Sequence, residues 1–289
     1  MCDDWLEVVW VGAYPLSLSV WGGRVTSMSN LNDGYENDPR GTDQLFHINV
    51  HPLPEGTSDK SPIWRYMDLH AALSTVIHNT LRFTRVSKFR DEWESRRGAA
   101  SRAAIDALNE AIADDSGTAH LLWPFEIFDN FYRENNFVSS WTRVDPDQMS
   151  MWLAYTNSDA SVALESTISS LAQTSTLNLN YADIGEINYI DPDIWVHSSG
   201  DNRELLYLKR PAFKFENEVR FAIEPASTHS PSGNPEDHVS LAIKDNTVSK
   251  IIVHPYMPEN TYSLLNDVIS KFQLNVLVEK TKIANKPTY

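Results

Sequence analysis

Two carboxylates stand two residues apart in Lys214–Phe221, a segment with the sequence KFENEVRF. Apolar and polar residues alternate along it, which predicts a strand with Glu216, Glu218 and Arg220 on one face. Paired carboxylates on a rigid strand could act as acid and base or stabilise a developing positive charge. The alternative is a solvated edge face on which Glu218 forms an ion pair with Arg220.

A charged residue between two bulky aromatic residues stands on another predicted strand, in Trp64-Arg65-Tyr66. A guanidinium group in such a place can hold a phosphate or a carboxylate through two parallel hydrogen bonds. An ion pair with a nearby acid such as Asp68 would explain the same residue without any ligand. Both interpretations of Arg65 stay open at the level of the sequence.

Two adjacent serines, Ser139 and Ser140, lie on a third predicted strand, between Phe137-Val138 and Trp141. Buried hydroxyl groups need partners, because an unsatisfied one costs about 1–3 kcal/mol. The partner can be the backbone of a neighbouring strand or a bound ligand. No Gly-x-Ser-x-Gly turn surrounds the pair, so we do not expect either serine to be a nucleophile.

These three segments need a common scaffold. Strands and helices are mixed along the chain without a regular alternation of strand, helix and strand. This predicts one α+β domain over residues 61–289, with a central, mostly antiparallel sheet that can be split and helices packed around it. Residues 1–60, with expected strands at Leu6–Val11 and Leu16–Trp21, are predicted to form an N-terminal β appendage and loop. The three strands described above are expected to lie close together.

A short helix is expected after Asp147, and it carries Met151, Trp152 and Tyr155. Residues four apart share a helix face, whereas Trp152 is turned about 100° away from its neighbour Met151. We therefore expect one of the two aromatic residues to line a cleft and the other to lie in the core.

The composition limits the partners of the chain, which has 289 residues, 24 Lys and Arg, 39 Asp and Glu, and a net charge of −15. Such a balance argues against indiscriminate binding to nucleic acid or to anionic lipid. No apolar run is long enough to span a membrane, so no membrane partner is expected. The single cysteine, Cys2, cannot form a disulfide within the chain, which suits a cytoplasmic protein.

Several of these segments together resemble a bacterial family, the domain-of-unknown-function family 2971. The resemblance extends over residues 61–280. The residues that carry it are Trp64-Arg65-Tyr66, Leu81-x-Phe83, Phe89-x-Asp91, Ser139-Ser140, Met151-Trp152-x-x-Tyr155, Lys209 and Phe213-x-x-Glu216-x-Glu218-Val219-Arg220. This resemblance implies no particular reaction.

The order arginine, serine, Glu-x-Glu is also similar to that of the arginine–serine–glutamate class of mono-ADP-ribosyltransferases. In that class an early strand carries the arginine, a serine-bearing strand precedes a short aromatic helix, and a Glu-x-Glu-Val segment follows. The residues that fall in this order are Arg65, Ser139-Ser140, Trp152 with Tyr155, and Glu216-x-Glu218-Val219. The chain departs from the class at Ser139-Ser140-Trp141-Thr142, which replaces Ser-Thr-Ser, and at Arg220, where the class has an apolar residue.

This second resemblance implies an ADP-ribosyltransferase-like fold and NAD as substrate, in a bacterial effector of a toxin or antiviral defence system. ADP-ribose would pass to an unknown protein or nucleic-acid acceptor, or to water. Breaking the nicotinamide–ribose bond develops positive charge on the ribose, which Glu218 would stabilise while Glu216 orients or deprotonates the acceptor. The residues implied to bind NAD are Arg65 at the pyrophosphate, Ser140 at a ribose or amide group, Tyr155 or Trp152 at the nicotinamide ring, and the neighbouring Tyr66 and Ser139.

The alternative function is a non-catalytic domain that senses a ligand or binds another protein. In that case Arg65 and the Glu218–Arg220 pair would be structural ion pairs. Arg220 separates the two hypotheses, because a cation that neutralises Glu218 would remove the charge on which NAD cleavage depends. No metal ion is expected in either case, since the acids around Trp93 have no histidine at helical spacing.

Overall fold

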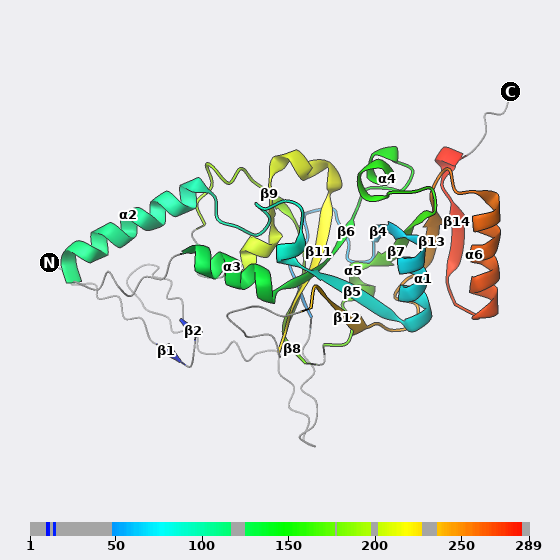
Figure 1. Ribbon diagram of the computed structural model, residues 1–289, viewed down its shortest axis with the longest axis horizontal. Coiled ribbons are helices and arrows are strands. Elements are labelled where there is room, and N and C mark those ends of the chain that lie inside the picture. The colour runs from blue at the N-terminus through cyan, green and yellow to red at the C-terminus, as the bar shows by residue number, and fades with distance from the viewer. Residues whose placement is uncertain are drawn as a thin grey trace, which may run out of the picture.

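The computed structural model describes residues 10–11, 14–15, 48–116, 125–176, 178–197, 202–226 and 236–284 (Figure 1). Its strands are β1 (Trp10–Val11), β2 (Tyr14–Pro15), β3 (Asn49–Val50), β4 (Pro62–Asp68), β5 (Thr80–Arg85), β6 (Phe137–Thr142), β7 (Ser161–Thr167), β8 (Leu179–Glu186), β9 (Asn188–Tyr189), β10 (Leu208–Lys209), β11 (Glu218–Pro225), β12 (His238–Ala242), β13 (Lys250–Val253) and β14 (Leu277–Lys280). Its α-helices are α1 (Leu69–His78), α2 (Ala99–Ser116), α3 (Phe125–Asn135), α4 (Met149–Tyr155), α5 (Ile168–Leu171) and α6 (Glu259–Lys271). Short 3₁₀ helices are η1 (Val86–Lys88), η3 (Asn202–Tyr207), η4 (Pro211–Glu216) and η5 (Lys282–Ala284).

One sheet of ten strands organises the molecule. Its main path runs β14-β13-β7-β4-β6-β11-β8-β3, and β5 with β12 joins it from the side. Most neighbours are antiparallel, whereas β13 with β14 and β3 with β8 run parallel. The predicted α+β class and the mostly antiparallel sheet are therefore confirmed. The strands that carry Arg65, Ser139 and Glu218 are direct neighbours, as expected.

The sheet forks at β6, because two strands share one of its edges. Trp64 of β4 lies opposite Thr142 at the end of β6, and Thr84 of β5 lies opposite Val138 near its start. Between these points no strand of the described structure pairs with this edge, while β11 pairs along the whole of the other edge. The split that the sequence allows is thus present as a gap between β4 and β5.

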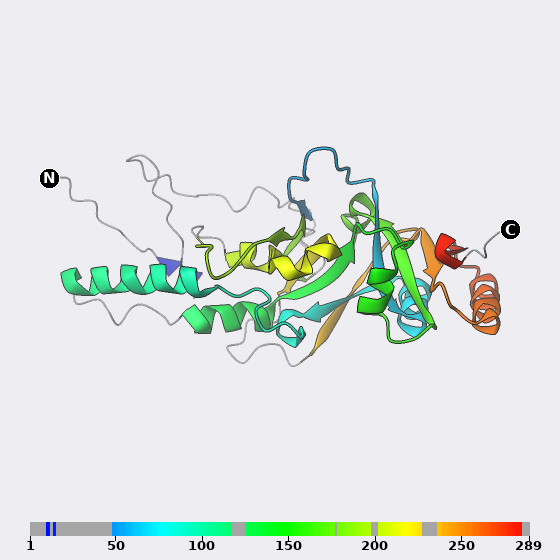
Figure 2. The same cartoon turned by 90° about the horizontal axis from the view of Figure 1, so that it is seen from above.

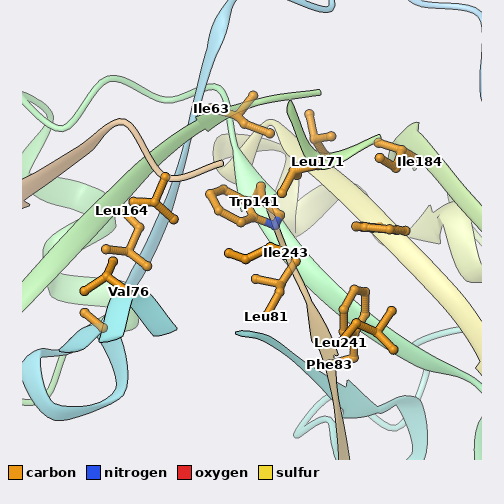
Figure 3. Close-up of a cluster of buried hydrophobic side chains, with 14 of the residues drawn as sticks. Ile63, Val76, Leu81, Phe83, Trp141, Leu164, Leu171, Ile184, Leu241 and Ile243 are labelled. Carbon is orange, nitrogen blue, oxygen red and sulfur yellow. The ribbon is translucent and has the colours of Figure 1, made fainter. Parts of the chain in front are cut away.

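Apolar side chains from alternate strand positions build the core on one face of the sheet (Figure 3). Ile63, Phe83, Trp141 and Leu164 come from four different strands and are all buried, and α1 adds Val76. Each large apolar side chain that leaves water contributes about 1.5–3 kcal/mol to folding. The opposite face of β4, β6 and β11 carries several polar side chains, and the candidate site lies there.

Helices lie at both ends of the molecule and above the middle of the sheet. α6 lies outside β14 at one edge of the sheet, whereas α2 and α3 extend at the opposite end (Figures 1 and 2). In Figure 1, α4 and the yellow 3₁₀ segment lie on the same side of β6 and β11, where they frame the cavity described below. Among the described residues, every helix is too short or too polar to cross a bilayer.

Part of the N-terminal region lies within the described residues. β3 extends the sheet beside β8, and the backbone nitrogen of His51 donates to the carbonyl oxygen of Ile184 at 2.8 Å. β1 and β2 pair with each other in antiparallel orientation. The predicted strand Leu16–Trp21 and most of Leu6–Val11 lie outside the described residues, so the appendage over residues 1–60 stays a prediction.

The segment with the two carboxylates is not the continuous strand that the alternation predicts. Pro211–Glu216 forms η4, and Asn217, with a φ of 43°, turns the chain before β11 begins at Glu218. Proline suits the first turn of a helix because its φ is fixed and it has no N–H to satisfy. Asparagine tolerates the left-handed conformation better than most residues. Glu216 and Glu218 therefore reach the site from two different elements.

Candidate functional site

A cavity of about 570 Å³ lies on the polar face of β4, β6 and β11. Its wall is completed by α4, by the loop that follows β5 and by η4. The predicted site residues that line it are Arg65, Tyr66, Ser140, Tyr155, Glu216 and Glu218. Two others, Ser139 and Trp152, are not part of the wall. Sites for small ligands typically have volumes of about 300–1,000 Å³, so the cavity is large enough for one.

Arg65 reaches the cavity through the gap between β4 and β5. Its Nη1 donates to the carbonyl oxygen of Arg82 at 2.8 Å and to Oγ of Ser139 at 2.6 Å. Within the described structure, Nε and Nη2 donate to nothing, and neither Asp68 nor any other carboxylate pairs with the group. Burial and the nearby Arg82 lower the pKa of Arg65 to about 10, so the side chain remains a cation at neutral pH.

Two more hydrogen-bond donors on β4 lack partners. Nε1 of Trp64 and the hydroxyl of Tyr66 are buried atoms that bond to no other described residue, and both residues line the cavity. An unsatisfied buried donor costs about 1–3 kcal/mol, so such atoms are uncommon unless something else binds them. The part of the cavity wall formed by β4 is therefore rich in unused donors.

Arg220 neutralises Glu218 from two residues further along β11. Its Nε donates to Oε1 of Glu218 at 2.9 Å, and both side chains are buried. Arg220 lies opposite Ser140 on β6 and Gly185 on β8. The structure thus contains the ion pair that the non-catalytic hypothesis requires of these two residues.

The other nitrogens of Arg220 are also occupied. Nη1 donates to the carbonyl oxygen of Leu206, and Nη2 donates to Oε1 of Glu94. The ring of Phe89 lies 5.8 Å from the guanidinium carbon. Burial acts to lower the pKa of Arg220, but the two carboxylates outweigh it and raise the pKa above its ordinary value. Every nitrogen of Arg220 therefore has a partner within the protein, and the group acts as a structural cation.

Lys209 joins the two predicted catalytic glutamates. Its Nζ lies 2.5 Å from Oε2 of Glu216 and 3.0 Å from Oε2 of Glu218. Burial acts to raise the pKa of Glu218, but Arg220 and Lys209 outweigh it and hold the pKa at about 2. Burial raises the pKa of Glu216, and Lys209 offsets only part of that effect. Glu218 is consequently an anion in contact with two cations.

The hydroxyl groups of Tyr155 and Ser140 lie at the cavity, whereas that of Ser139 does not. Burial raises the pKa of Tyr155, and a hydrogen bond between its hydroxyl and Glu216 raises it further. Ser140 hydrogen-bonds to Glu218 and helps to keep it ionised. Ser139 instead accepts hydrogen bonds from Nη1 of Arg65 and from Nε1 of Trp141. Ser139 therefore positions Arg65 and does not face the cavity.

The two aromatic residues of α4 divide as expected, one in the core and one at the cavity. Trp152 has 0% of its surface exposed, and its Nε1 donates to the carbonyl oxygen of Pro146 at 2.7 Å. Its ring packs edge-on against Tyr66, with the ring centroids 4.8 Å apart. Tyr155 is 44% exposed and lines the cavity. Of the two rings proposed to stack on a ligand, Trp152 is buried too deeply to do so, and Tyr155 remains available.

Sequence reasoning does not single out Trp64, Arg90 or Phe215 as site residues, yet all three line the cavity. Arg90 is exposed and forms no ion pair with another described residue. The apolar–polar alternation of the predicted strand would place Phe215 on the core face, but the residue lies in η4 and its side chain is exposed. The sequence feature that could have predicted this helix is Pro211, because proline favours the first turn of a helix over the interior of a strand.

No protein-family model, no curated protein and no solved structure matches this chain. The two family resemblances therefore stay predictions. In the part of the chain that the structure describes, no three His, Cys, Asp or Glu side chains are grouped so that they could hold a metal ion.

The cavity wall has two chemically distinct parts. On one side, Arg65 has a guanidinium group without a carboxylate partner among the described residues, and Trp64 and Tyr66 have buried donors without partners. On the other side, three glutamates are interleaved with Lys209 and Arg220, which satisfy most of their charge. The first part has polar groups without a partner in the described structure, whereas the charges of the second part are paired with one another.

Proposed function

We propose that the cavity binds a small ligand through an oxyanion, a phosphate or a carboxylate, that Arg65 holds. The observation that carries this proposal is a partly buried guanidinium group in the cavity wall with two unused nitrogens and no carboxylate partner in the described structure. A guanidinium group matches the two oxygens of such an anion through parallel hydrogen bonds. Burial without an anion is costly for a cation, so a bound oxyanion would relieve that cost.

The charges around Arg65 support the same proposal. Arg82 contributes its carbonyl oxygen to Arg65, and its side chain, like that of Arg90, has no ion pair among the described residues. Arg82 is close enough to lower the pKa of Arg65, and Arg90 also lines the cavity, so none of these three arginines has a neutralising carboxylate among the described residues. Such a local concentration of positive charge attracts anions even though the whole chain carries a net charge of −15.

The pairing of Glu218 with Arg220 supports binding over NAD cleavage. A carboxylate stabilises a developing cation best when its own charge is not already compensated. Glu218 contacts Arg220 at 2.9 Å and Lys209 at 3.0 Å, and both of these cations are largely buried with it. Cleavage would require Glu218 to leave at least one of these contacts.

NAD cleavage is the second candidate function. One observation favours it: Arg65, Ser140, Tyr155, Glu216 and Glu218, in the order of the arginine–serine–glutamate class, line one cavity. An ADP-ribosyltransferase-like fold, a cytoplasmic location and a role as a bacterial toxin or antiviral effector belong to this candidate. The acceptor in that case would be water or an unknown protein or nucleic acid.

Calorimetric titration tests the proposed binding. Inorganic phosphate and acetate are titrated into the wild type, into Arg65→Ala and into Lys271→Ala, a matched control that removes one exposed positive charge from α6. We expect saturable binding of at least one anion by the wild type and the control, and a loss of at least tenfold in affinity for Arg65→Ala. The anion that binds more tightly identifies the oxyanion as phosphate or carboxylate.

Equal affinity of Arg65→Ala and the wild type would contradict the proposal, and so would the absence of binding by the wild type. The second candidate is tested in parallel by incubating the protein with NAD and measuring free nicotinamide. We expect no release above the rate without protein. Release that Glu218→Gln abolishes would favour the second candidate instead.

A further inference from the structure

Two aromatic side chains in the cavity wall are exposed to solvent. Phe215 on η4 is 50% exposed and Tyr155 on α4 is 44% exposed. Large apolar side chains are usually buried when the fold offers room, because exposure forfeits their transfer free energy. Neither ring belongs to an apolar cluster of the described residues. Packing of the core therefore does not explain their positions.

The two aromatic residues line the same cavity from neighbouring elements. The hydroxyl of Tyr155 hydrogen-bonds to Glu216, which directly follows Phe215 in the chain. α4 and η4, which carry them, lie on the same side of the sheet in Figure 1. Nζ of Lys209 lies 2.5 Å from Oε2 of Glu216 and 5.0 Å from the ring centroid of Phe213, so one lysine contacts two residues of η4.

We infer that Tyr155 and Phe215 hold a flat ring of the ligand whose oxyanion is bound at Arg65. This inference rests on the proposed function, because all three residues line the same cavity. Aromatic side chains stack on planar rings of many kinds and are tolerant of the ring's identity. The chemical class that combines a planar ring with an oxyanion and fits a cavity of about 570 Å³ is a mononucleotide.

The polar groups between the two ends of the cavity suit such a ligand. Ser140 and the carboxylates of Glu216 and Glu218 line the cavity together with Arg65 and Tyr155. Hydroxyl and carboxylate groups can bind sugar hydroxyls. A mononucleotide would thus place its phosphate at the arginine, its sugar along the polar wall and its base at the two rings.

Two probes that differ only in the ring test the inference. Adenosine monophosphate carries a base, whereas ribose 5-phosphate carries the same sugar and phosphate without it. Both are titrated into the wild type, Tyr155→Ala and Phe215→Ala. Phe272→Ala is the matched control, because Phe272 is 53% exposed but directly follows α6, far from the cavity.

We expect the wild type and Phe272→Ala to bind adenosine monophosphate roughly tenfold or more tightly than ribose 5-phosphate. Tyr155→Ala and Phe215→Ala should each lose most of this preference while their affinity for ribose 5-phosphate is unchanged. Equal affinity of the wild type for the two probes would overturn the inference and leave the anion site at Arg65 intact. Binding of neither probe would also overturn the inference, and the separate titrations with phosphate and acetate would then decide whether the anion site at Arg65 exists.

Discussion

Nε of Arg220 lies 2.9 Å from Oε1 of Glu218, and both side chains, which stand on β11, are buried. Glu94, from the loop after β5, contacts the same guanidinium group. The pair thus ties the loop, β11 and, through Lys209, η4 to one another. This network gives the cavity a rigid wall, and it does not include Arg65, which has no carboxylate partner among the described residues.

Removing one member of the buried pair should be strongly destabilising. We expect Glu218→Gln and Arg220→Met each to lower the free energy of unfolding by about 3–5 kcal/mol, because each leaves a buried charge without its partner. The double variant should lose less than the sum of the two. Urea unfolding of the four proteins measures the coupling.

The exposed pair Lys280–Glu259, with 3.0 Å between Nζ and Oε2, is the matched control for this cycle. Its coupling should be about 0.2–1 kcal/mol, as is usual for exposed pairs. A coupling between Glu218 and Arg220 that is no larger than that of the control pair would show that the buried contact does not exist in solution.

The depressed pKa of Glu218 predicts a loss of stability in acid. Its pKa is about 2 in the folded protein against 4.5 for an ordinary glutamate, so the folded state is stabilised while Glu218 is ionised. This contribution is complete above pH 4.5 and disappears as the pH falls towards 2. We expect the difference in unfolding free energy between the wild type and Glu218→Gln to shrink by about 3 kcal/mol over this range.

Thermal or urea unfolding at intervals from pH 6 to pH 2 measures this effect. Glu259→Gln serves as the control, because Glu259 is exposed at the start of α6 and should follow the wild type at every pH. Glu216 acts with the opposite sign, since its raised pKa means that its ionisation weakens the folded state as the pH rises. A difference between the wild type and Glu218→Gln that stays constant with pH would contradict the prediction.

The two aromatic residues of α4 should differ sharply in their effect on stability. Trp152→Ala removes a fully buried side chain and the hydrogen bond from its Nε1, so we expect a loss of about 3–5 kcal/mol. Tyr155→Ala removes a half-exposed ring at the cavity and should change stability by less than about 1 kcal/mol. Urea unfolding measures the free energy of unfolding of the two variants. Equal losses in free energy would mean that Tyr155 also belongs to the core.

The sequence predicts the class of the fold and the neighbourhood of the site better than its local geometry. The strands expected around Arg65 and Ser139 are present, and they are neighbours in a mostly antiparallel sheet, as expected. The period-two pattern at Phe213–Glu216 is wrong, because Pro211 begins a 3₁₀ helix there, in which burial recurs every three residues, at Phe213 and Glu216, and not every two. The gap between β4 and β5 is a consequence of pairing between distant segments, which no local pattern encodes.

The partners of the charged residues could be predicted only in part. Glu218 and Arg220 stand two apart on one strand, so their contact follows from the period of the strand. Glu94 and Lys209 join them from elements that are far away in the sequence, and only the folded chain reveals them. The lack of a carboxylate at Arg65 is likewise a property of the assembled structure, since several acids stand near it in the sequence.

The most direct test of the oxyanion site is to observe the Arg65 side chain itself by nuclear magnetic resonance. The Nε–H signal of Arg65 is assigned by its disappearance in Arg65→Lys and is then followed while inorganic phosphate is added. We expect the signal to shift saturably, with the Nε–H signals of arginines outside the cavity, such as Arg102, unchanged. A signal of Arg65 that does not move with phosphate, nor with acetate titrated in the same way, would contradict the binding of an oxyanion at this residue.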